Sequence, residues 1–232
     1  MDTPVNKYEE GQVLLINKPL NWTSFDVIQK LRNILRIKKI GHAGTLDPLA
    51  TGLLIICTGK FTKRINEFMA QEKEYTGTFT LGATTPTYDL ESEPENFKPV
   101  DDISDTAIQE ATKKFSGEIL QVPPAHSAIK MGGTRVYELA RQGKEVIMEP
   151  RKVTIKEFAI TRIDPVANGL RVVHFKVVCT TGTYIRSLAK DFGDALGCGA
   201  FLSSLCRTRI GTYSNEDAMT PESFREKINK EL

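Results

Sequence analysis

The chain has 232 residues, 40% of them apolar and 26% charged, so it can bury a core and has the composition of an ordinary soluble globular protein. Its polar N-terminus lacks the apolar segment of a signal peptide, and its longest apolar run, Leu53 to Cys57, is too short to span a bilayer. The 4 cysteines and 3 histidines lack metal-ligand spacing, so we expect a reduced, cytoplasmic protein that holds no metal.

Secondary structure in the first third of the chain is predicted from hydrophobic periodicity and turn residues. In chain order the expected elements are a strand at 13–16, a helix capped by Thr23 or Ser24 that ends before Gly41, a loop at 41–52, a buried strand at 53–57, a helix around 62–70 and a strand at 75–81.

The remaining elements mix strands and helices without a strict β-α-β rhythm. In chain order they are an acidic loop at 84–100, a helix at 104–116, a basic excursion at 130–152 with a short helix near 135–142, strands at 153–163 and 170–179, a helix at 184–196, a returning strand at 200–209 and a final helix from Pro221. We therefore predict one α+β domain, residues 1–232, around a mixed, mainly antiparallel sheet flanked by helices.

Charge is distributed unevenly along the chain. The net charge is +2, but between Asp89 and Asp105 seven acids accompany one lysine, which leaves a charge of +8 on the rest of the chain. A polyanion is therefore a permitted partner. On charge alone, a solvated surface with one acidic loop is the simpler interpretation.

Asp47 is the carboxylate best placed for chemistry. It lies in a loop between a predicted helix and a buried strand, and Gly41, Gly44 and Gly52 allow a ligand to approach the backbone closely. The local sequence by itself favours a simpler interpretation, in which Asp47 and the following proline only start a turn.

Several other side chains have both a functional and an ordinary interpretation. His42 could be a general base, an RNA contact or a turn residue, and Tyr75 could be a stacking platform for a base or a half-buried strand residue. Arg186 begins a predicted helix, where the helix dipole offers its charge no gain. It could clamp a carboxylate in bidentate fashion or lie on the surface. No dinucleotide-binding or P-loop motif occurs in a strand-to-helix context.

Blocks of sequence along nearly the whole chain resemble the TruB family of tRNA pseudouridine synthases. The longest is GHAGTLDPLATGLL, from Gly41 to Leu54. Other matching blocks, in the family's order, are Asn17-Lys18-Pro19, Thr23-Ser24, Lys73-Glu74-Tyr75, Leu81 to Thr85, Thr87-Tyr88-Asp89, Gln121 to Pro124, Ser127 to Lys130, Tyr137 to Arg141, Gly182 to Arg186 and Leu196 to Ala200. The resemblance runs from about Val13 to Gly211.

The resemblance implies an activity. The family isomerises uridine 55 in the T loop of tRNA to pseudouridine, without a cofactor, after the target base is extruded from its stack. The expected partner is therefore tRNA, bound through its T arm. We expect a monomer in the cytoplasm with no membrane association and no obligate protein partner.

The resemblance also assigns site residues. Asp47 matches the catalytic aspartate, a nucleophile that splits one difficult step into two. Tyr75 matches the tyrosine that stacks on the flipped uracil, and Arg186 the arginine that pairs with the aspartate. Positions matching those that line the base pocket or contact the flipped nucleotide are His42, Tyr184 and Leu205, and further RNA contacts are expected from Lys18, Lys130, Arg141 and Arg207.

Other features concern the grip on RNA. The basic excursion, about 124–152, is similar to the family's RNA-clasping insertion. About twenty residues follow Gly211, too few for the C-terminal PUA domain of many members, so a short form without it is expected. Cys206 and His126 replace an arginine and an aromatic residue that are common in the family.

Two alternative functions remain open on the sequence. One is a non-enzymatic RNA-binding or tRNA-folding protein on the same scaffold, against which the presence of Asp47, Tyr75 and Arg186 argues. The other is a pseudouridine synthase with a different target, such as rRNA or a site selected by a guide RNA.

Overall fold

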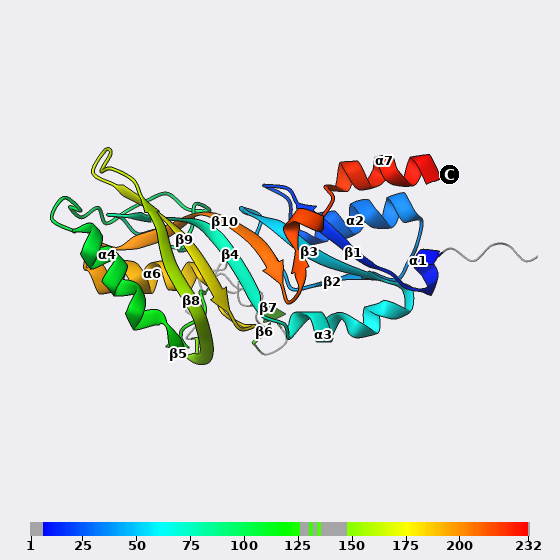
Figure 1. The fold of residues 1–232 in the computed structure, drawn as a ribbon, viewed down its shortest axis with the longest axis horizontal. Coiled ribbons are helices and arrows are strands. Elements are labelled where there is room, and N and C mark those ends of the chain that lie inside the picture. Colours follow the sequence, from blue (N-terminus) through cyan, green and yellow to red (C-terminus); the bar gives the residue numbers. More distant parts are fainter. Residues whose placement is uncertain (1–6, 126–129, 132–133, 136–147, 232) are drawn as a thin grey trace, which may run out of the picture. The chain divides into compact units, whose positions relative to one another are not determined.

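The computed structural model describes residues 7–125, 130–131, 134–135 and 148–231. The chain forms two compact units. The first unit comprises Met1–Tyr75 and Leu205–Leu232, and the second comprises Thr76–Ser204. Strands β4 (Lys73–Leu81) and β10 (Ala200–Ile210) each contribute residues to both units (Figure 1).

In the first unit, β3 (Ala50–Thr58) is the central strand and is buried along almost its whole length. It pairs antiparallel with β1 (Val13–Lys18) and β2 (Ile40–Ala43), and parallel with the end of β10. The register sets Leu205 opposite Ala50 and Arg207 opposite Gly52. The other elements of this unit are α1 (Lys7–Glu10), η1 (Gly59–Arg64), α3 (Ile65–Met69), β11 (Tyr213–Ser214) and η3 (Asn215–Asp217).

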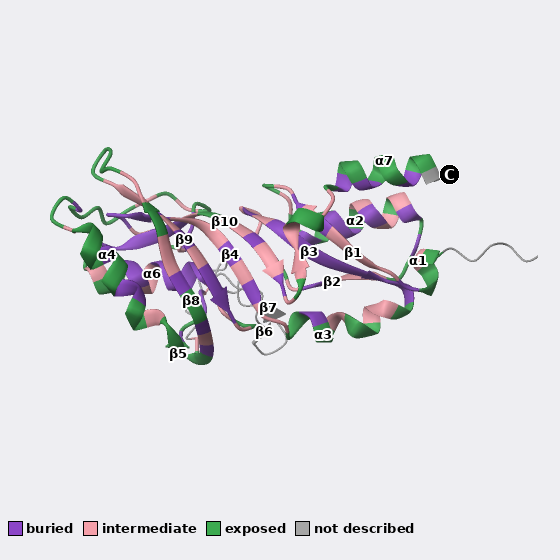
Figure 2. Cartoon of the chain, in the orientation of Figure 1, coloured by how far each residue is buried: buried purple, intermediate pink, exposed green. Residues whose placement is uncertain are grey.

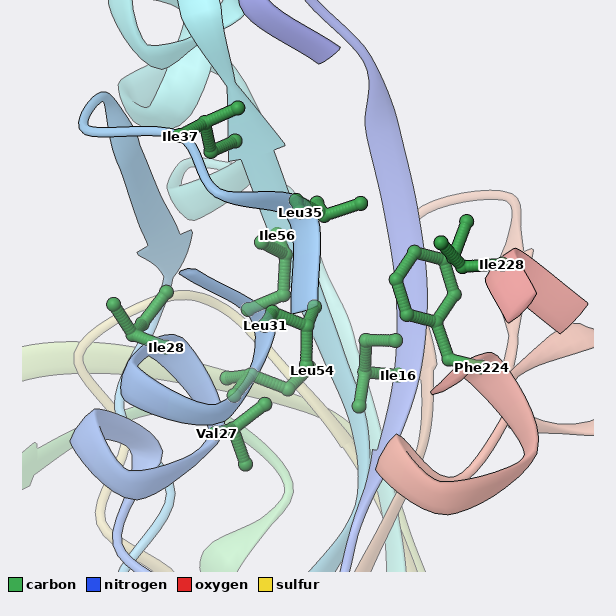
Figure 3. Close-up of a cluster of buried hydrophobic side chains, with 10 residues drawn as sticks. All are labelled: Ile16, Val27, Ile28, Leu31, Leu35, Ile37, Leu54, Ile56, Phe224 and Ile228. Carbon is green, nitrogen blue, oxygen red and sulfur yellow. The ribbon is translucent and has the colours of Figure 1, made fainter. Parts of the chain in front are cut away.

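Helices α2 (Ser24–Leu35) and α7 (Pro221–Glu231) complete the core of the first unit. A capping box starts α2: the Thr23 hydroxyl accepts from the Asp26 amide at 3.0 Å, and the Asp26 carboxylate accepts from the Thr23 amide at 2.8 Å. The apolar face of α2 packs on β1 and β3 and on the inner face of α7 (Figure 3). The buried residues of this cluster are Ile16, Val27, Ile28, Leu31, Leu35, Ile37, Leu54, Ile56, Phe224 and Ile228.

The second unit is a sheet in the order β10-β4-β9-β8-β5, with β8 (Arg151–Ile163) antiparallel to β9 (Arg171–Cys179) and to β5 (Gly117–Gln121). Its core is aromatic: Phe79 stacks on Phe175 with ring centroids 4.2 Å apart. Helix α6 (Ile185–Leu196) turns its buried face inward (Figure 2). The other elements are α4 (Asp105–Ala111), η2 (Thr112–Phe115) and the two-stranded pair β6 (Lys130–Met131) and β7 (Thr134–Arg135).

The predicted α+β class and the mixed, mainly antiparallel sheet are confirmed, and two local predictions are corrected. The loop expected at 41–52 is shorter, because residues 40–43 form β2 and β3 already begins at Ala50. The helices expected around 62–70 and at 104–116 each divide into a 3-10 turn and an α-helix. The helix expected near 135–142 lies outside the described residues.

No helix in the described part of the chain is long and apolar enough to cross a membrane. The same residues contain no group of three or more His, Cys, Asp or Glu side chains that could hold a metal ion. The four cysteines are reduced thiols; Cys57, Cys179 and Cys198 are buried and Cys206 is partly exposed. Burial raises the pKa of the Cys57 thiol to about 11.

Candidate active site

Asp47 lies on the short connection between β2 and β3, residues 44–49, which we call the Asp47 loop. Its side chain is partly exposed. The buried Ser24 hydroxyl fixes the neighbouring residue, because it accepts from the Leu46 amide at 2.9 Å and donates to the Leu46 carbonyl at 3.2 Å. The Asp47 carboxylate is therefore presented by a backbone that the start of α2 holds in place.

Lys18 holds the backbone on the C-terminal side of Asp47, at Pro48. Its side chain is 0% exposed, and its Nζ donates to the carbonyls of Pro19 at 2.8 Å, Trp22 at 2.5 Å and Pro48 at 3.2 Å. The amide of Asn21 donates to the same Pro48 carbonyl at 2.9 Å. The ammonium thus joins the end of β1 to the residue that follows Asp47.

The pKa of Lys18 is lowered to about 8, chiefly by burial and to a smaller extent by the charge of Arg207, while Asp47 and Asp26 partly offset the fall. A lysine in this position is still largely protonated at neutral pH. Its proton is nevertheless held weakly enough to be lost within an ordinary working range of pH.

Arg207 is the second buried cation, 1% exposed. Its Nε donates to the Leu53 carbonyl at 2.8 Å, and a terminal nitrogen donates to the Gly44 carbonyl at 3.0 Å. Lys18 and Arg207 were both predicted to contact RNA. Both side chains are buried here and direct their hydrogen bonds at backbone carbonyls, and their contact with RNA stays a prediction.

His42 lies in β2 opposite Ile56, so its interpretation as a turn residue is wrong. Burial and the charge of Arg207 lower its pKa, and the Gly44 backbone only partly offsets this, so the imidazole is neutral at pH 7. Its Nδ1 is buried and has no partner in hydrogen-bond geometry within the described part of the chain. A neutral ring suits contact with a nucleobase better than proton donation.

Tyr75 and Leu205 are placed by β4 and β10 in the first unit. Tyr75 is 8% exposed, more deeply buried than the half-buried strand residue considered from the sequence. Leu205 is partly exposed opposite Ala50, and its carbonyl accepts from the Thr51 hydroxyl at 3.3 Å. Their roles toward a base stay predictions.

In the second unit, Arg186 is buried near the start of α6, so its interpretation as a surface arginine is wrong. One terminal nitrogen lies 3.6 Å from Oδ2 of Asp89, with both side chains 5% exposed. The same nitrogen donates to the Thr87 carbonyl at 3.4 Å. The carboxylate offsets the cost of placing a cation at the positive end of a helix.

Sequence reasoning missed Asp89 as a site residue, because it was counted with the exposed acids of its loop. The one feature of the sequence that pointed to Asp89 was its place in the family-like block Thr87-Tyr88-Asp89. Arg186 was predicted to pair with Asp47, which belongs to the other unit, and that pairing stays a prediction.

Tyr184 occupies the N-cap position of α6, and its backbone is held by Gln121, to which the sequence analysis assigned no role. The Tyr184 amide donates to the Gln121 side-chain oxygen at 2.8 Å, and the Gln121 amide group donates to the Tyr184 carbonyl at 3.1 Å. The Ser187 hydroxyl donates to the Val122 carbonyl at 2.7 Å. The Tyr184 ring, partly exposed, therefore projects from a fixed backbone.

Two expected RNA contacts fall in the basic excursion. Lys130 lies in β6, paired with Arg135 of β7. Arg141 lies outside the described residues, as does much of the expected clasping insertion. Both assignments stay predictions.

Comparison with known families gives two matches that follow one another along the chain. Residues 32–185 match the family model described as TruB family pseudouridylate synthase, N-terminal domain. Residues 186–231 match the model described as tRNA pseudouridylate synthase B C-terminal domain.

Similar proteins cover nearly the full length of this chain and are themselves nearly fully covered. A tRNA pseudouridine synthase B from Flavobacterium johnsoniae is 54% identical over 229 residues, which are 96% of this chain and 98% of that protein. One from Bacteroides fragilis is 47% identical over 230 residues, 97% of each chain.

Among solved structures, a chain in the crystal structure of a Cbf5-Nop10-Gar1 complex is 30% identical, with a TM-score of 0.71 over 94% of this chain. A chain in an H/ACA RNP bound to a substrate RNA containing 2′-deoxyuridine is 26% identical, with a TM-score of 0.66 over 97% of this chain. This chain spans only 54% and 55% of those two chains.

Proposed function

This chain belongs to the TruB family of pseudouridine synthases, which are isomerases, and we propose that it converts uridine 55 in the T loop of tRNA to pseudouridine with Asp47 as nucleophile. One observation carries the proposal. Within the block that matches the family, a partly exposed carboxylate stands on a loop whose backbone is fixed from both sides by Ser24 and Lys18. Catalysis by a preorganised nucleophile requires such a support.

The reaction needs no net oxidation or reduction. The bond from uracil N1 to the sugar breaks, the detached uracil turns, and C5 bonds to the same sugar carbon. C5 then loses a proton and N1 ends protonated, so the product is an isomer of the substrate. The Asp47 carboxylate stabilises or attacks the electron-poor sugar as the base leaves.

The uridine must leave its stack first, at a cost of about a few kcal/mol. Tyr75, the neutral His42 ring, Tyr184 and Leu205 are the side chains proposed to receive the extruded nucleotide. Aromatic stacking contributes about 1–3 kcal/mol per base, enough to offset much of that cost. We propose that the catalytic domain includes both of the compact units described above.

The test is to incubate the purified protein with an unmodified tRNA transcript and to map pseudouridine along it. We expect one product in the T loop, absent when the transcript carries cytidine at position 55. A product at another tRNA position, or only in an rRNA or guide-paired RNA, would contradict the assignment to uridine 55. Tight tRNA binding without any product would favour the non-enzymatic alternative.

The pH dependence of this reaction is expected to reflect Lys18. The rate should fall as the pH rises through about 8, because the neutral amine has too few N–H donors for its three carbonyl partners. Lys18→Met should be slow at every pH and should lack this alkaline decline. Single-turnover rates from about pH 6 to about pH 10 measure it, with Lys30→Met, which removes a surface ion pair to Glu222, as the control.

The same titration affects stability in the opposite direction. The pKa of Lys18 is about 8 in the folded protein and 10.5 in an ordinary lysine, so between these values the unfolded chain binds more protons. The contribution of Lys18 to the free energy of unfolding therefore rises with pH in this interval. A decline in rate without a fall in Tm would support the positioning role, and a parallel fall in both would contradict it.

A further inference from the structure

Arg207 spans the Asp47 loop. Its guanidinium donates to Gly44, where the loop begins, and to Leu53, which lies in β3 beyond the loop's end. Each hydrogen bond from a charged group is worth more than one between neutral groups. A planar guanidinium also fixes the directions of its donors, so these two bonds hold the carbonyls in a set geometry.

The backbone of Arg207 leaves no room for a side chain at Gly52. A Cβ on Gly52 would come within 2.4 Å of the Arg207 carbonyl oxygen and 2.7 Å of its amide nitrogen, and Gly52 has a φ of +100°. A Cβ on Gly44, which has a φ of +88°, would lie 3.5 Å from a guanidinium nitrogen. Close approach to Arg207 therefore explains the glycine at position 52, whereas the left-handed backbone explains the glycine at position 44.

The charge of Arg207 also acts on two other side chains of the first unit, Lys18 and His42. It lowers the pKa of Lys18 and of His42, so the guanidinium lies in electrostatic reach of both. The guanidinium is nearly fully buried, and it donates hydrogen bonds to the backbone carbonyls of Leu53 and Gly44.

From these contacts we propose that Arg207 is a positioning residue for the reaction: it bridges Gly44 and Leu53, sets the shape of the Asp47 loop, and makes no contact with RNA. The proposal rests on the proposed function. It predicts that Arg207 affects the chemical step and not the affinity for tRNA, which a surface arginine would control.

Arg207→Lys keeps the charge but replaces the fork by one ammonium, which cannot hold both carbonyls in the same geometry. A misplacement near 1 Å costs about 100-fold in rate, so we expect a fall of about 10- to 100-fold in the single-turnover rate. The Kd for tRNA should change less than about twofold, since no phosphate contact is lost. The matched control is Arg209→Lys, in the same strand, which alters a surface pair with Glu72.

Arg207→Gln adds a second measurement, the pH dependence of the rate, which would not change if Arg207 only stabilised the fold. Removing the charge should shift the Lys18-dependent alkaline decline to higher pH, whereas Arg207→Lys should leave it in place. Gly44→Ala strains the left-handed backbone at the residue whose carbonyl Arg207 holds, and it serves as the test if the Arg207 variants do not fold. It should also slow the single-turnover rate without weakening tRNA binding.

All rates are measured well below each variant's Tm, beside wild type. A wild-type rate in Arg207→Lys would overturn the proposal. So would a loss of rate that is matched by a loss of tRNA affinity, if Arg207→Gln also leaves the pH of the alkaline decline unchanged. Failure of wild type itself to form pseudouridine would instead reject the proposed function, so the two failures are distinguishable.

Discussion

Asp47→Asn is expected to abolish pseudouridine formation, lowering the single-turnover rate by about four orders of magnitude or more. The amide has nearly the same shape as the carboxylate but is neither charged nor nucleophilic. The support from Ser24 to Leu46 and from Lys18 to Pro48 uses the backbone, so it should survive the substitution. Affinity for tRNA is therefore expected to stay within a few-fold of wild type.

The matched control is Asp217→Asn, an exposed aspartate in the same unit, which should retain the wild-type rate. Single-turnover rates are measured with the enzyme in excess over tRNA, at a concentration that binds all of the tRNA. The affinity for tRNA is measured separately by filter retention. Retention of wild-type turnover by Asp47→Asn would reject the proposed nucleophile. Loss of tRNA binding together with turnover would point to a misfolded loop.

Arg186→Gln should have the next largest effect, on both rate and stability. It leaves the Asp89 carboxylate buried without its cation, and breaking a buried ion pair costs about 3–5 kcal/mol in the free energy of unfolding. If Arg186 also stabilises charge in the reaction, the rate should fall by about 100- to 1,000-fold even where the protein is folded. Denaturant unfolding and single-turnover kinetics measure the two effects.

The double variant Arg186→Gln/Asp89→Asn separates them. It replaces the buried pair by two neutral amides, so much of the lost stability should return. The rate should not return, because the guanidinium is still absent. Recovery of both would mean that Arg186 acts only through stability. The control is Lys190→Gln on the same helix, whose exposed pair with Asp194 contributes about 1 kcal/mol at most.

Much of the fold follows from local sequence. The three- and four-residue spacing in α2, its Thr23 cap and the apolar run of β3 predicted elements that the structure contains. The loop around Asp47 was predicted too long, because glycine was interpreted as a loop signal. Gly52 instead lies inside β3, where Arg207 of β10 approaches too closely for a side chain.

The buried residues that hold the candidate site in place were harder to predict than the residues proposed to act on the substrate. Lysine and arginine are usually exposed, so the sequence held no sign that Lys18 and Arg207, expected from the resemblance to contact RNA, are buried. Their burial depends on partners far along the chain, since Arg207 reaches Gly44 across 163 positions. Asp89 and Gln121 were likewise hidden, because their partners Arg186 and Tyr184 follow in a later helix.

The order in which a ribosome delivers the chain bears on the Asp47 loop. Asp47 is synthesised early, but the first unit is completed only by Leu205–Leu232, after the whole of the second unit. Arg207 arrives in this last stretch, as do Phe224 and Ile228, which close the core against α2. Residues 76–204 can begin to fold during translation, whereas the Asp47 loop lacks its contact with Arg207 until residues 205–232 have emerged. The proposed nucleophile is thus made early, but its loop is completed only after Arg207 has been added.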